Sequence, residues 1–337
     1  MRERFRVVGG GRLVGEVAVG GAKNSALKLM AVALLAPGRT RLTNVPAIRD
    51  VEIMAELLRR LGVVVEHDAP GGVVEIDVPE VIGHRADYEL VRALRASISV
   101  LGPLVARCGQ ADVAVPGGDA IGSRGLDLHA AGLEALGAQV RVERGYLLAE
   151  ATGGLHGAAV SLDFPSVGAT ENILTAAVLA RGVTVLDNAA REPEIVDIAD
   201  LLTAMGARIS GAGSSRIEIE GVSELRPATH AVVPDRIAAG TWAYAAATTR
   251  GDVEIVGGVA DHLRLPLDLL VDGGTDVCLT ERGFRVVGDP ARRPRSITVA
   301  TLPYPGFPTD LQPFALVYDA VAEGSAMVTE NLFEARF

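Results

Sequence analysis

Two segments combine charged side chains with clustered glycines, an arrangement suited to binding an anionic substrate and moving protons on it. The first, GGAKNS, places Lys23 and Asn24 after two glycines, at the predicted start of a buried helix. An ammonium group there would add to the helix dipole and the free N–H groups, which together favour an anion. The alternative is purely structural: a glycine turn followed by a helix that Asn24 or Ser25 caps.

The second segment, VPGGDAIGSRGLDLH, runs from Val115 to His129 and contains four glycines. This density gives a loop many backbone conformations and is typical of a mobile lid. The loop carries an acid, Asp119, and a guanidinium group, Arg124, so it could supply a proton donor and an anion clamp. The alternative is an ordinary turn with aspartate in a favoured turn position.

Three further motifs place polar side chains in or before apolar helices. Arg95, in LRASIS, falls inside a predicted buried helix, where a guanidinium group needs a carboxylate or a ligand as its partner. Asp310, in FPTDLQPF, precedes another helix, either as a functional carboxylate or as an N-cap. DFPSVGATEN, from Asp163, is a Pro/Gly loop that opens a third helix at Thr170.

Composition excludes several function classes. A net charge of −10 and an aromatic content of 4% argue against nucleic-acid binding, which needs a basic face or stacking platforms. The two cysteines cannot form a disulfide framework, and the six histidines are scattered without metal-ligand spacing. No phosphate-binding loop or nucleophile elbow occurs. We therefore expect chemistry by carboxylates, Arg and Lys, with no metal and no cofactor.

The first residues, MRERFRVV, do not form a signal peptide, and no run of 18 apolar residues occurs. We expect a cytoplasmic protein with no membrane partner. Nothing in the sequence indicates an oligomeric state.

The elements that must position these residues recur along the chain. The copies that start at Gly38 and Gly182 share the pattern Thr-x-Leu-x-Asn and a helix that ends in glycine, and looser copies start at Gln110, Gly251 and Gly324. An apolar helix precedes each copy, and low polarity on all sides predicts that these helices are buried. The five helices are predicted at Ser25–Ala36, Leu90–Ala106, Thr170–Ala180, Ile237–Thr248 and Leu311–Ala322. Alternating strands and helices with glycine-rich turns indicate an α/β fold with mixed sheets.

Seven motifs resemble those of the enolpyruvyl transferases that act on UDP-N-acetylglucosamine, the actinobacterial members in particular. They are GGAKNSALKLMAVALLA, LRASISVLGPLVAR, VPGGDAIGSRGLDLH, FPSVGATENI, NAAREPEIVD, FPTDLQPF and ENLFEARF. The resemblance covers the whole chain in order. It implies two domains, each an inside-out α/β barrel of repeated βαβαββ units. We expect the first over residues 22–231, with three units and the glycine-rich loop, and the second from residues 1–21 and 232–337.

The resemblance also implies a reaction. The enolpyruvyl group of phosphoenolpyruvate would move to the 3′-hydroxyl of UDP-N-acetylglucosamine with release of phosphate. This transferase reaction is the first committed step of peptidoglycan synthesis, and so of cell wall biogenesis, cell shape and cell division. Both partners are then small-molecule substrates. The alternatives are a non-catalytic relative that binds the UDP-sugar and the sister enzyme of the shikimate pathway.

Residue roles follow from the same resemblance. Lys23 and Arg124 would hold the phosphate and carboxylate of phosphoenolpyruvate, Asp119 would protonate its C3 as general acid, and Asp310 would take the proton of the attacking hydroxyl. The remaining positions expected to line the substrate site are Asn24, Arg95, Gly125, Leu126, Asp127, Leu128, Phe164, Pro165, Ser166, Val167 and Leu332.

Three departures from the family pattern matter. Asp119 stands where most members have the cysteine that fosfomycin alkylates, which predicts intrinsic resistance to that epoxide. Gly125 stands where proline is usual, which predicts a more flexible loop. The family continues for about one more unit beyond Phe337, so we expect the second domain to be incomplete here. Its apolar core would then be exposed on one side, an aggregation hazard.

Overall fold

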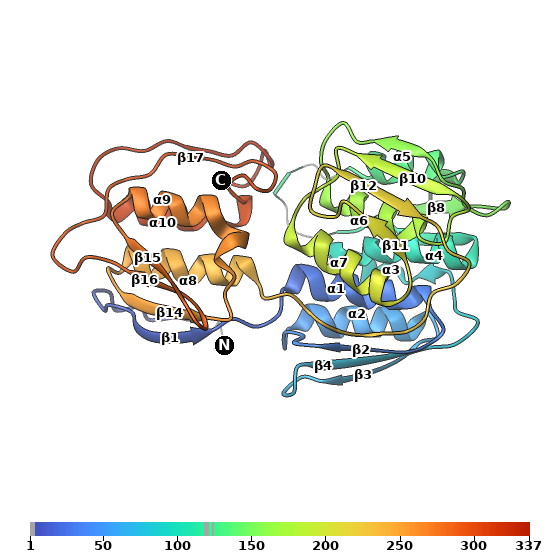
Figure 1. Ribbon diagram of the computed structural model, residues 1–337, viewed down its shortest axis with the longest axis horizontal. Coiled ribbons are helices and arrows are strands. Elements are labelled where there is room, and N and C mark those ends of the chain that lie inside the picture. The colour runs from blue at the N-terminus through green and yellow to red at the C-terminus, as the bar shows by residue number, and fades with distance from the viewer. Residues whose placement is uncertain (1–3, 118–120, 123–124) are drawn as a thin grey trace. The chain divides into compact units, whose positions relative to one another are not determined.

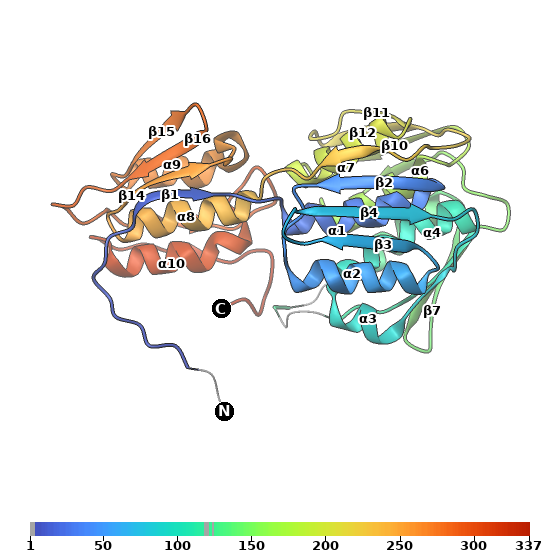
Figure 2. The ribbon, with the colours of Figure 1, turned by 90° about the horizontal axis from the view of Figure 1, so that it is seen from below.

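The computed structural model of the protein describes residues 4–117, 121–122 and 125–337. The chain forms two compact units, each of which can be followed by colour in Figures 1 and 2. The continuous unit comprises Gly20–Val233 together with the short segment Glu334–Arg336. The split unit is formed by the N-terminal segment up to Val19 and by Pro234–Phe333.

Three four-stranded sheets of one pattern occur in the described part of the continuous unit. Their strand orders are β13-β2-β4-β3, β5-β6-β8-β7 and β11-β12-β10-β9, and each joins one parallel pair to two antiparallel pairs. The strands are β2 (Gly38–Thr43), β3 (Val64–Asp68), β4 (Val73–Val78), β5 (Arg85–Ala86), β6 (Gln110–Ala114), β7 (Gln139–Glu143), β8 (Tyr146–Glu150), β9 (Ala159–Ser161), β10 (Val183–Asp187), β11 (Arg208–Ser210), β12 (Arg216–Glu220) and β13 (Thr229–Ala231). This repetition confirms the predicted mixed α/β fold.

Helices α1 (Lys23–Val32), α4 (Leu101–Cys108) and α6 (Val167–Ala177) form the core that these sheets cover. Every residue of α6 from Ala169 to Ala177 is buried, including the polar Glu171 and Asn172, whose side chains have hydrogen-bond partners inside the unit. Figure 2 shows β2, β4 and β3 running side by side across α1. The other helices of the unit are α2 (Arg49–Arg60), α3 (Tyr88–Ala93), α5 (Asp127–Ala135) and α7 (Pro193–Ala204), and the short 3-10 turn η1 (Ala33–Leu35) extends α1.

The Thr-x-Leu-x-Asn repeat has a structural cause. Asn44 and Asn188 both adopt a left-handed backbone with φ of 55°, which asparagine tolerates better than most residues. Each side-chain amide donates a hydrogen bond to the segment that follows the neighbouring parallel strand, Asn44 to the carbonyl of Val232 at 2.9 Å and Asn188 to that of Leu162 at 2.7 Å. The repeated asparagine therefore fixes the exit of the parallel strand pair in two of the sheets.

The predicted helix over Leu90–Ala106 is wrong as a single element. The chain is extended at Leu94, with φ −141° and ψ 114°, and continues as the 3-10 helix η2 (Arg95–Val100) before α4 begins. Small polar and β-branched residues alternate in the segment SISV and weaken the α-helix there. Arg95 therefore begins a tight turn and is half-buried, whereas the sequence predicted a buried position inside a helix.

The split unit packs helices against the sheet β1-β14-β16-β15. In its aromatic core, the ring of Tyr244 lies edge-on to the rings of Phe307 and Tyr318. The ring centroids are 6.1 and 6.0 Å apart, a favoured geometry for aromatic pairs. The elements are β1 (Val14–Ala18), α8 (Arg236–Thr248), β14 (Asp252–Val256), η3 (Ala260–Leu263), α9 (Arg264–Asp272), β15 (Asp276–Thr280), β16 (Gly283–Val287), β17 (Val299–Ala300), η4 (Thr309–Leu311), α10 (Gln312–Val321) and β18 (Val328–Thr329).

Helices α8 and α10 are less buried than their apolar sequences predicted. Each turns one face to the core, through residues such as Tyr244 and Tyr318, while Trp242 remains 39% exposed and Val317 56% exposed. Low polarity on all sides therefore predicted full burial correctly for α6 but not for α10, whose packing partners α8, η4 and β18 leave its other face uncovered.

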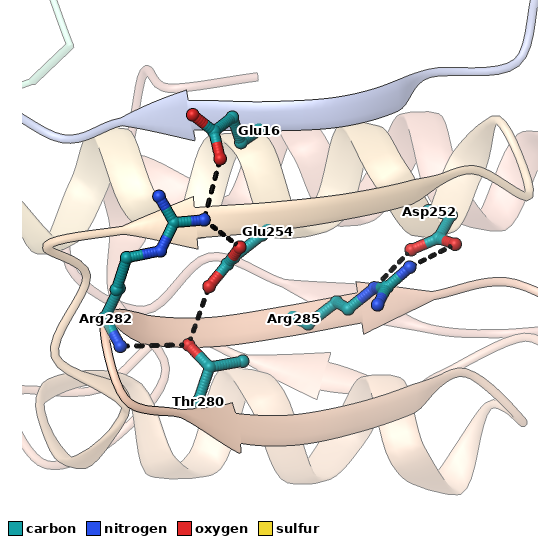
Figure 3. A network of polar contacts seen from close by, with 6 residues as sticks. All are labelled: Glu16, Asp252, Glu254, Thr280, Arg282 and Arg285. Carbon is teal, nitrogen blue, oxygen red and sulfur yellow. Dashed lines mark hydrogen bonds and ion pairs between the residues drawn. The ribbon is translucent and has the colours of Figure 1, made fainter.

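An ion-pair network ties β1 to strands more than 200 residues later in the chain. Arg282 bridges Glu16 on β1 and Glu254 on β14, and the hydroxyl of Thr280 also donates to Glu254 at 3.0 Å (Figure 3). Arg285 binds both carboxylate oxygens of Asp252, at 2.6 and 2.7 Å, in the bidentate geometry that guanidinium groups favour. The network lies on an exposed sheet surface and has no part in the candidate site described below.

Candidate active site

The start of α1 presents Lys23 at the surface of the continuous unit. Its ammonium group pairs with Asp50 of α2 at 3.0 Å, and its side chain remains 52% exposed. Neither Asn24 nor Ser25 caps the helix: the N-cap is Ala22, which makes no side-chain cap. The capping interpretation is therefore wrong, and a ligand or Asp50 is the partner that suits the charge of Lys23.

Ser25 instead faces the interior and donates to the carboxylate of Asp197 on α7. The same carboxylate pairs with the Nε2 atom of His230 at 2.7 Å and accepts from the backbone N–H of Val233 at 3.1 Å. Asp197 thus joins three segments that lie far apart in the sequence. Because these contacts begin two residues after Lys23, they fix where the first turn of α1 presents that side chain.

The predicted UDP-sugar positions of α5 and α6 are brought together by a buried amide. The Oδ1 atom of Asn172 accepts from the backbone N–H of Gly102 at 2.7 Å, which leaves its NH₂ group to donate to Gly168 and to Nδ1 of His129, at 3.2 and 3.0 Å. His129 lies in the first turn of α5, next to Leu128, and Gly168 lies in the first turn of α6. The two helix starts are therefore held together.

The segment before α6 is shaped by its own cap. Ser166 is the N-cap and accepts from the backbone N–H of Ala169 at 3.3 Å, so α6 begins at Val167 and not at Thr170 as predicted. Phe164 is 47% exposed, so part of its ring is at the surface beside the helix start. Pro165 lies between them, and Ser166 N–H donates to the carbonyl of Phe164 at 2.7 Å, which closes a tight turn.

The hydrogen bonds of Asn172 also fix the protonation state of His129. Because Asn172 donates to Nδ1, that nitrogen must be unprotonated. Burial, and to a smaller extent the positive charge of Arg95, lower the pKa of His129 from 6.5 to about 4, although the negative charge of Asp127 partly opposes both effects. Arg95 of η2 therefore acts electrostatically on His129 of α5, as does Asp127 of the same helix.

The lowered pKa of His129 predicts how the free energy of unfolding depends on pH. Its pKa is lower in the folded state, so the unfolded chain binds the proton first and the free energy of unfolding should fall as pH drops from about 6.5 to about 4. The expected loss from this group is about 3 kcal/mol at pH 4. Urea unfolding of the wild type and of His129→Gln, followed between pH 4 and 7, measures it. His156→Gln, at an exposed histidine, is the matched control, and equal pH slopes in the wild type and His129→Gln would refute the assignment.

Two predicted residues lie in the split unit. Asp310 is the middle residue of η4, half-buried, so the structure places it inside the turn and not at the N-cap, which is Pro308. Leu332 lies in the segment after β18, where its backbone N–H donates to the carboxylate of Glu330 at 2.8 Å.

Asp119 and Arg124 lie outside the described residues. Gly125, next to them, precedes the first turn of α5, and Leu126 is the N-cap residue of that helix. Asn24 follows Lys23 at the start of α1 and is exposed, as Lys23 is.

Within the described part of the chain, no three His, Cys, Asp or Glu side chains are grouped so that they could hold a metal ion. Over the same residues, no helix combines the length and the apolar character that crossing a membrane requires.

Sequence reasoning did not single out Asp197, Asn172 or Glu330. The sequence does contain a signal for Asp197, because its carboxylate lies among the apolar residues Ile198 and Leu201 on the buried face of α7, where it needs a partner. Glu330 offered no such signal, since an acidic residue after a short strand is ordinary.

Comparison with known proteins agrees with this architecture. Residues 7–337 match the family model described as EPSP synthase (3-phosphoshikimate 1-carboxyvinyltransferase). Among solved structures, the enolpyruvyl transferase NikO from Streptomyces tendae matches with a TM-score of 0.83 and 24% identity, over 96% of this chain and 76% of that one. EPSP synthase from Acinetobacter baumannii matches with a TM-score of 0.68 and 20% identity, over 95% of this chain and 74% of that one. These similarities show the fold.

Curated relatives are much more similar in sequence. The UDP-N-acetylglucosamine 1-carboxyvinyltransferases of Corynebacterium jeikeium and Mycobacterium tuberculosis are 59% and 56% identical to this chain, each over its full length and over 79% of the relative. That of Nocardia farcinica is 58% identical with the same coverage. The chain therefore belongs to the EPSP synthase family of enolpyruvyl transferases and, within it, to the group named UDP-N-acetylglucosamine 1-carboxyvinyltransferase.

Proposed function

We propose that the protein transfers the enolpyruvyl group of phosphoenolpyruvate to the 3′-hydroxyl of UDP-N-acetylglucosamine and releases phosphate, the first committed step of peptidoglycan synthesis. The observation that carries this proposal is an identity of 59% to a relative of that name, over every residue of the chain. Structural neighbours at 24% identity or less would by themselves leave the substrate open.

In the proposed mechanism, Lys23 and Arg124 hold the anionic groups of phosphoenolpyruvate. Asp119 donates a proton to C3, which makes C2 electrophilic, while Asp310 takes the proton of the 3′-hydroxyl as its oxygen bonds to C2. The resulting tetrahedral intermediate then loses a proton from C3, the bond from C2 to the phosphate oxygen breaks, and the enol ether remains on the sugar. The ion pair of Lys23 with Asp50 would orient the ammonium group for this task.

The sugar would lie against two segments that the Asn172 amide holds together. These are the starts of α5, with Asp127 and Leu128, and of α6, with Val167. The exposed ring of Phe164 offers an apolar surface beside them, and Arg95 offers a positive charge for the diphosphate.

Turnover assays test the function. Protein expressed from its complete natural gene should release phosphate from phosphoenolpyruvate when UDP-N-acetylglucosamine is present, and should not do so with shikimate 3-phosphate. Binding of the UDP-sugar without phosphate release would indicate a non-catalytic relative. Activity with shikimate 3-phosphate would indicate the sister enzyme.

Because residue 119 is an aspartate and not a cysteine, we expect the protein to be insensitive to fosfomycin. An epoxide of this kind alkylates a thiolate and not a carboxylic acid, so the wild type should gain no mass on the peptide that contains residue 119, whereas Asp119→Cys should gain one adduct there. Mass spectrometry after incubation with the drug measures both. Cys278, an exposed thiol, reports nonspecific alkylation within the same molecule. An adduct on residue 119 of the wild type, distinguished by peptide fragmentation from one on the neighbouring thiol Cys108, would exclude Asp119 as the basis of resistance.

A further inference from the structure

The carboxylate of Glu330 joins the turn that carries Asp310 to the segment that carries Leu332. On one side, its Oε2 atom accepts from the hydroxyl of Thr309 at 2.8 Å. Thr309 is the first residue of η4 and immediately precedes Asp310. It is only 9% exposed, so water competes little for this hydrogen bond. The position of Thr309 therefore determines where the turn holds the backbone of Asp310.

On the other side, Oε1 of Glu330 accepts three hydrogen bonds. The backbone N–H groups of Leu332 and Phe333 donate to it at 2.8 and 3.1 Å, and the hydroxyl of Thr301 donates at 2.8 Å. The direction of the last bond is fixed, because the same hydroxyl accepts from the N–H of Asn331 at 2.8 Å. One side chain thus fixes the backbone of Leu332 and Phe333, in the segment that follows β18.

These four donors explain the charge of Glu330. Partial burial by itself would raise its pKa, but the hydrogen bonds from Leu332, Thr309, Thr301 and Phe333 outweigh burial and lower the pKa below its usual value. The group is therefore ionised at neutral pH. Because both oxygens are engaged by protein donors, Glu330 is poorly placed to exchange a proton with a substrate.

We propose that Glu330 is a positioning residue, which sets the carboxylate of Asp310 in register with the sugar that the Leu332 segment contacts. This inference rests on the proposed function, in which Asp310 is the base, and on the expectation from the family resemblance that Leu332 lines the sugar site. A general base must lie within hydrogen-bond reach of its proton, and a misplacement of 1 Å can lower the rate by about 10²-fold. Linking both segments to one carboxylate fixes that distance.

The sharpest test removes only the link to the Asp310 turn. Thr309→Val keeps the size of the side chain and loses the hydroxyl, so kcat should fall by about 10²-fold while KM for UDP-N-acetylglucosamine stays nearly unchanged. Thr309→Ser restores the hydroxyl and should recover most of kcat. Glu330→Ala should lower kcat and also raise KM for the sugar, because the N–H groups of Leu332 and Phe333 lose their acceptor.

A matched control lies on the exposed sheet of the same unit. Thr280→Val also removes a hydrogen bond from threonine to glutamate, that to Glu254 at 3.0 Å, and it should leave kcat and KM unchanged. Thermal unfolding of every variant is recorded alongside. Wild-type kcat in Thr309→Val would overturn the proposal. So would a Thr309→Ser variant that is as slow as Thr309→Val although it unfolds at the wild-type temperature.

Calorimetry separates this proposal from the proposed function. If the wild type binds UDP-N-acetylglucosamine but releases no phosphate, the enzymatic function fails and affinity becomes the readout. Weaker sugar binding in Glu330→Ala would then support positioning of the Leu332 segment, and equal affinity would overturn it. If the wild type does not bind the sugar at all, both proposals fail.

Discussion

Asp310→Asn should lower kcat by about 10²–10⁴-fold, the usual effect of removing a general base. Asparagine has nearly the same shape, so the turn η4 and its hydrogen bond to Glu330 should persist while the ability to accept a proton is lost. If Asp310 acts only when the hydroxyl attacks, KM for both substrates should change little. Steady-state phosphate release at saturating concentrations of both substrates measures kcat.

The matched control for this variant is Asp261→Asn, at an exposed carboxylate of the same unit that pairs with Arg264. It should show wild-type kinetics. A kcat of Asp310→Asn within the range of the control would remove Asp310 from the role of base. An unchanged kcat with a raised KM would make it a binding residue instead.

Lys28→Met should destabilise the continuous unit by about 3–5 kcal/mol, the usual effect of leaving a buried charge without its partner. Lys28, one of only two lysines in the chain, pairs with Glu171 at 2.9 Å between α1 and α6. The exposed fractions of the two side chains are 12% and 3%, so Glu171 cannot recover its hydration by turning to water. Circular dichroism or amide exchange must follow the unfolding, because Trp242 lies in the other unit.

The pH dependence of this variant has a definite sign. Burial raises the pKa of Glu171, and Lys28 partly offsets that effect. Without Lys28 the pKa of Glu171 in the folded state should rise further above its value in the unfolded chain. The variant should therefore lose stability as pH rises from the unfolded-state pKa through the folded-state pKa of Glu171. Lys28→Met should therefore be closer to the wild type at pH 5 than at pH 8.

Two further variants decide whether the ion pair is the cause. Lys28→Met combined with Glu171→Met removes both charges and should recover most of the lost stability. Arg141→Met breaks an exposed pair with Glu150 at 2.7 Å and should have little effect, because water screens that pair. Equal destabilisation by the buried and the exposed single variants would contradict the argument.

The sequence by itself determined the architecture and the residue types of the site. The repeat of an apolar helix, alternating strands and a Thr-x-Leu-x-Asn turn predicted mixed α/β units, because hydrophobic periodicity and turn chemistry are local properties. It also placed Lys23 at a helix start and Asp310 before a buried helix, within a few residues of where they lie. The motifs that carry the family resemblance are contiguous, so they could be recognised without a fold.

Local pattern failed where packing at long range decided the outcome. The break at Leu94 has a local cause, because the apolar residues of the segment predict a helix while the small polar and β-branched residues of SISV weaken it. Ser25 looks like a cap, yet it bonds to Asp197, a residue 172 positions away. Neighbours at that separation meet only when helices pack, and no periodicity encodes them.

The pairing of Lys28 with Glu171 and the four donors on Glu330 likewise exist only in the folded chain. A carboxylate in a sequence can be a cap, a surface charge, a base or a structural acceptor, because its role depends on which donors surround it and how far water is excluded. The sequence could therefore name Asp310 as a candidate base. Only the tertiary structure shows that Glu330, 20 residues later, links the turn of Asp310 to the segment of Leu332.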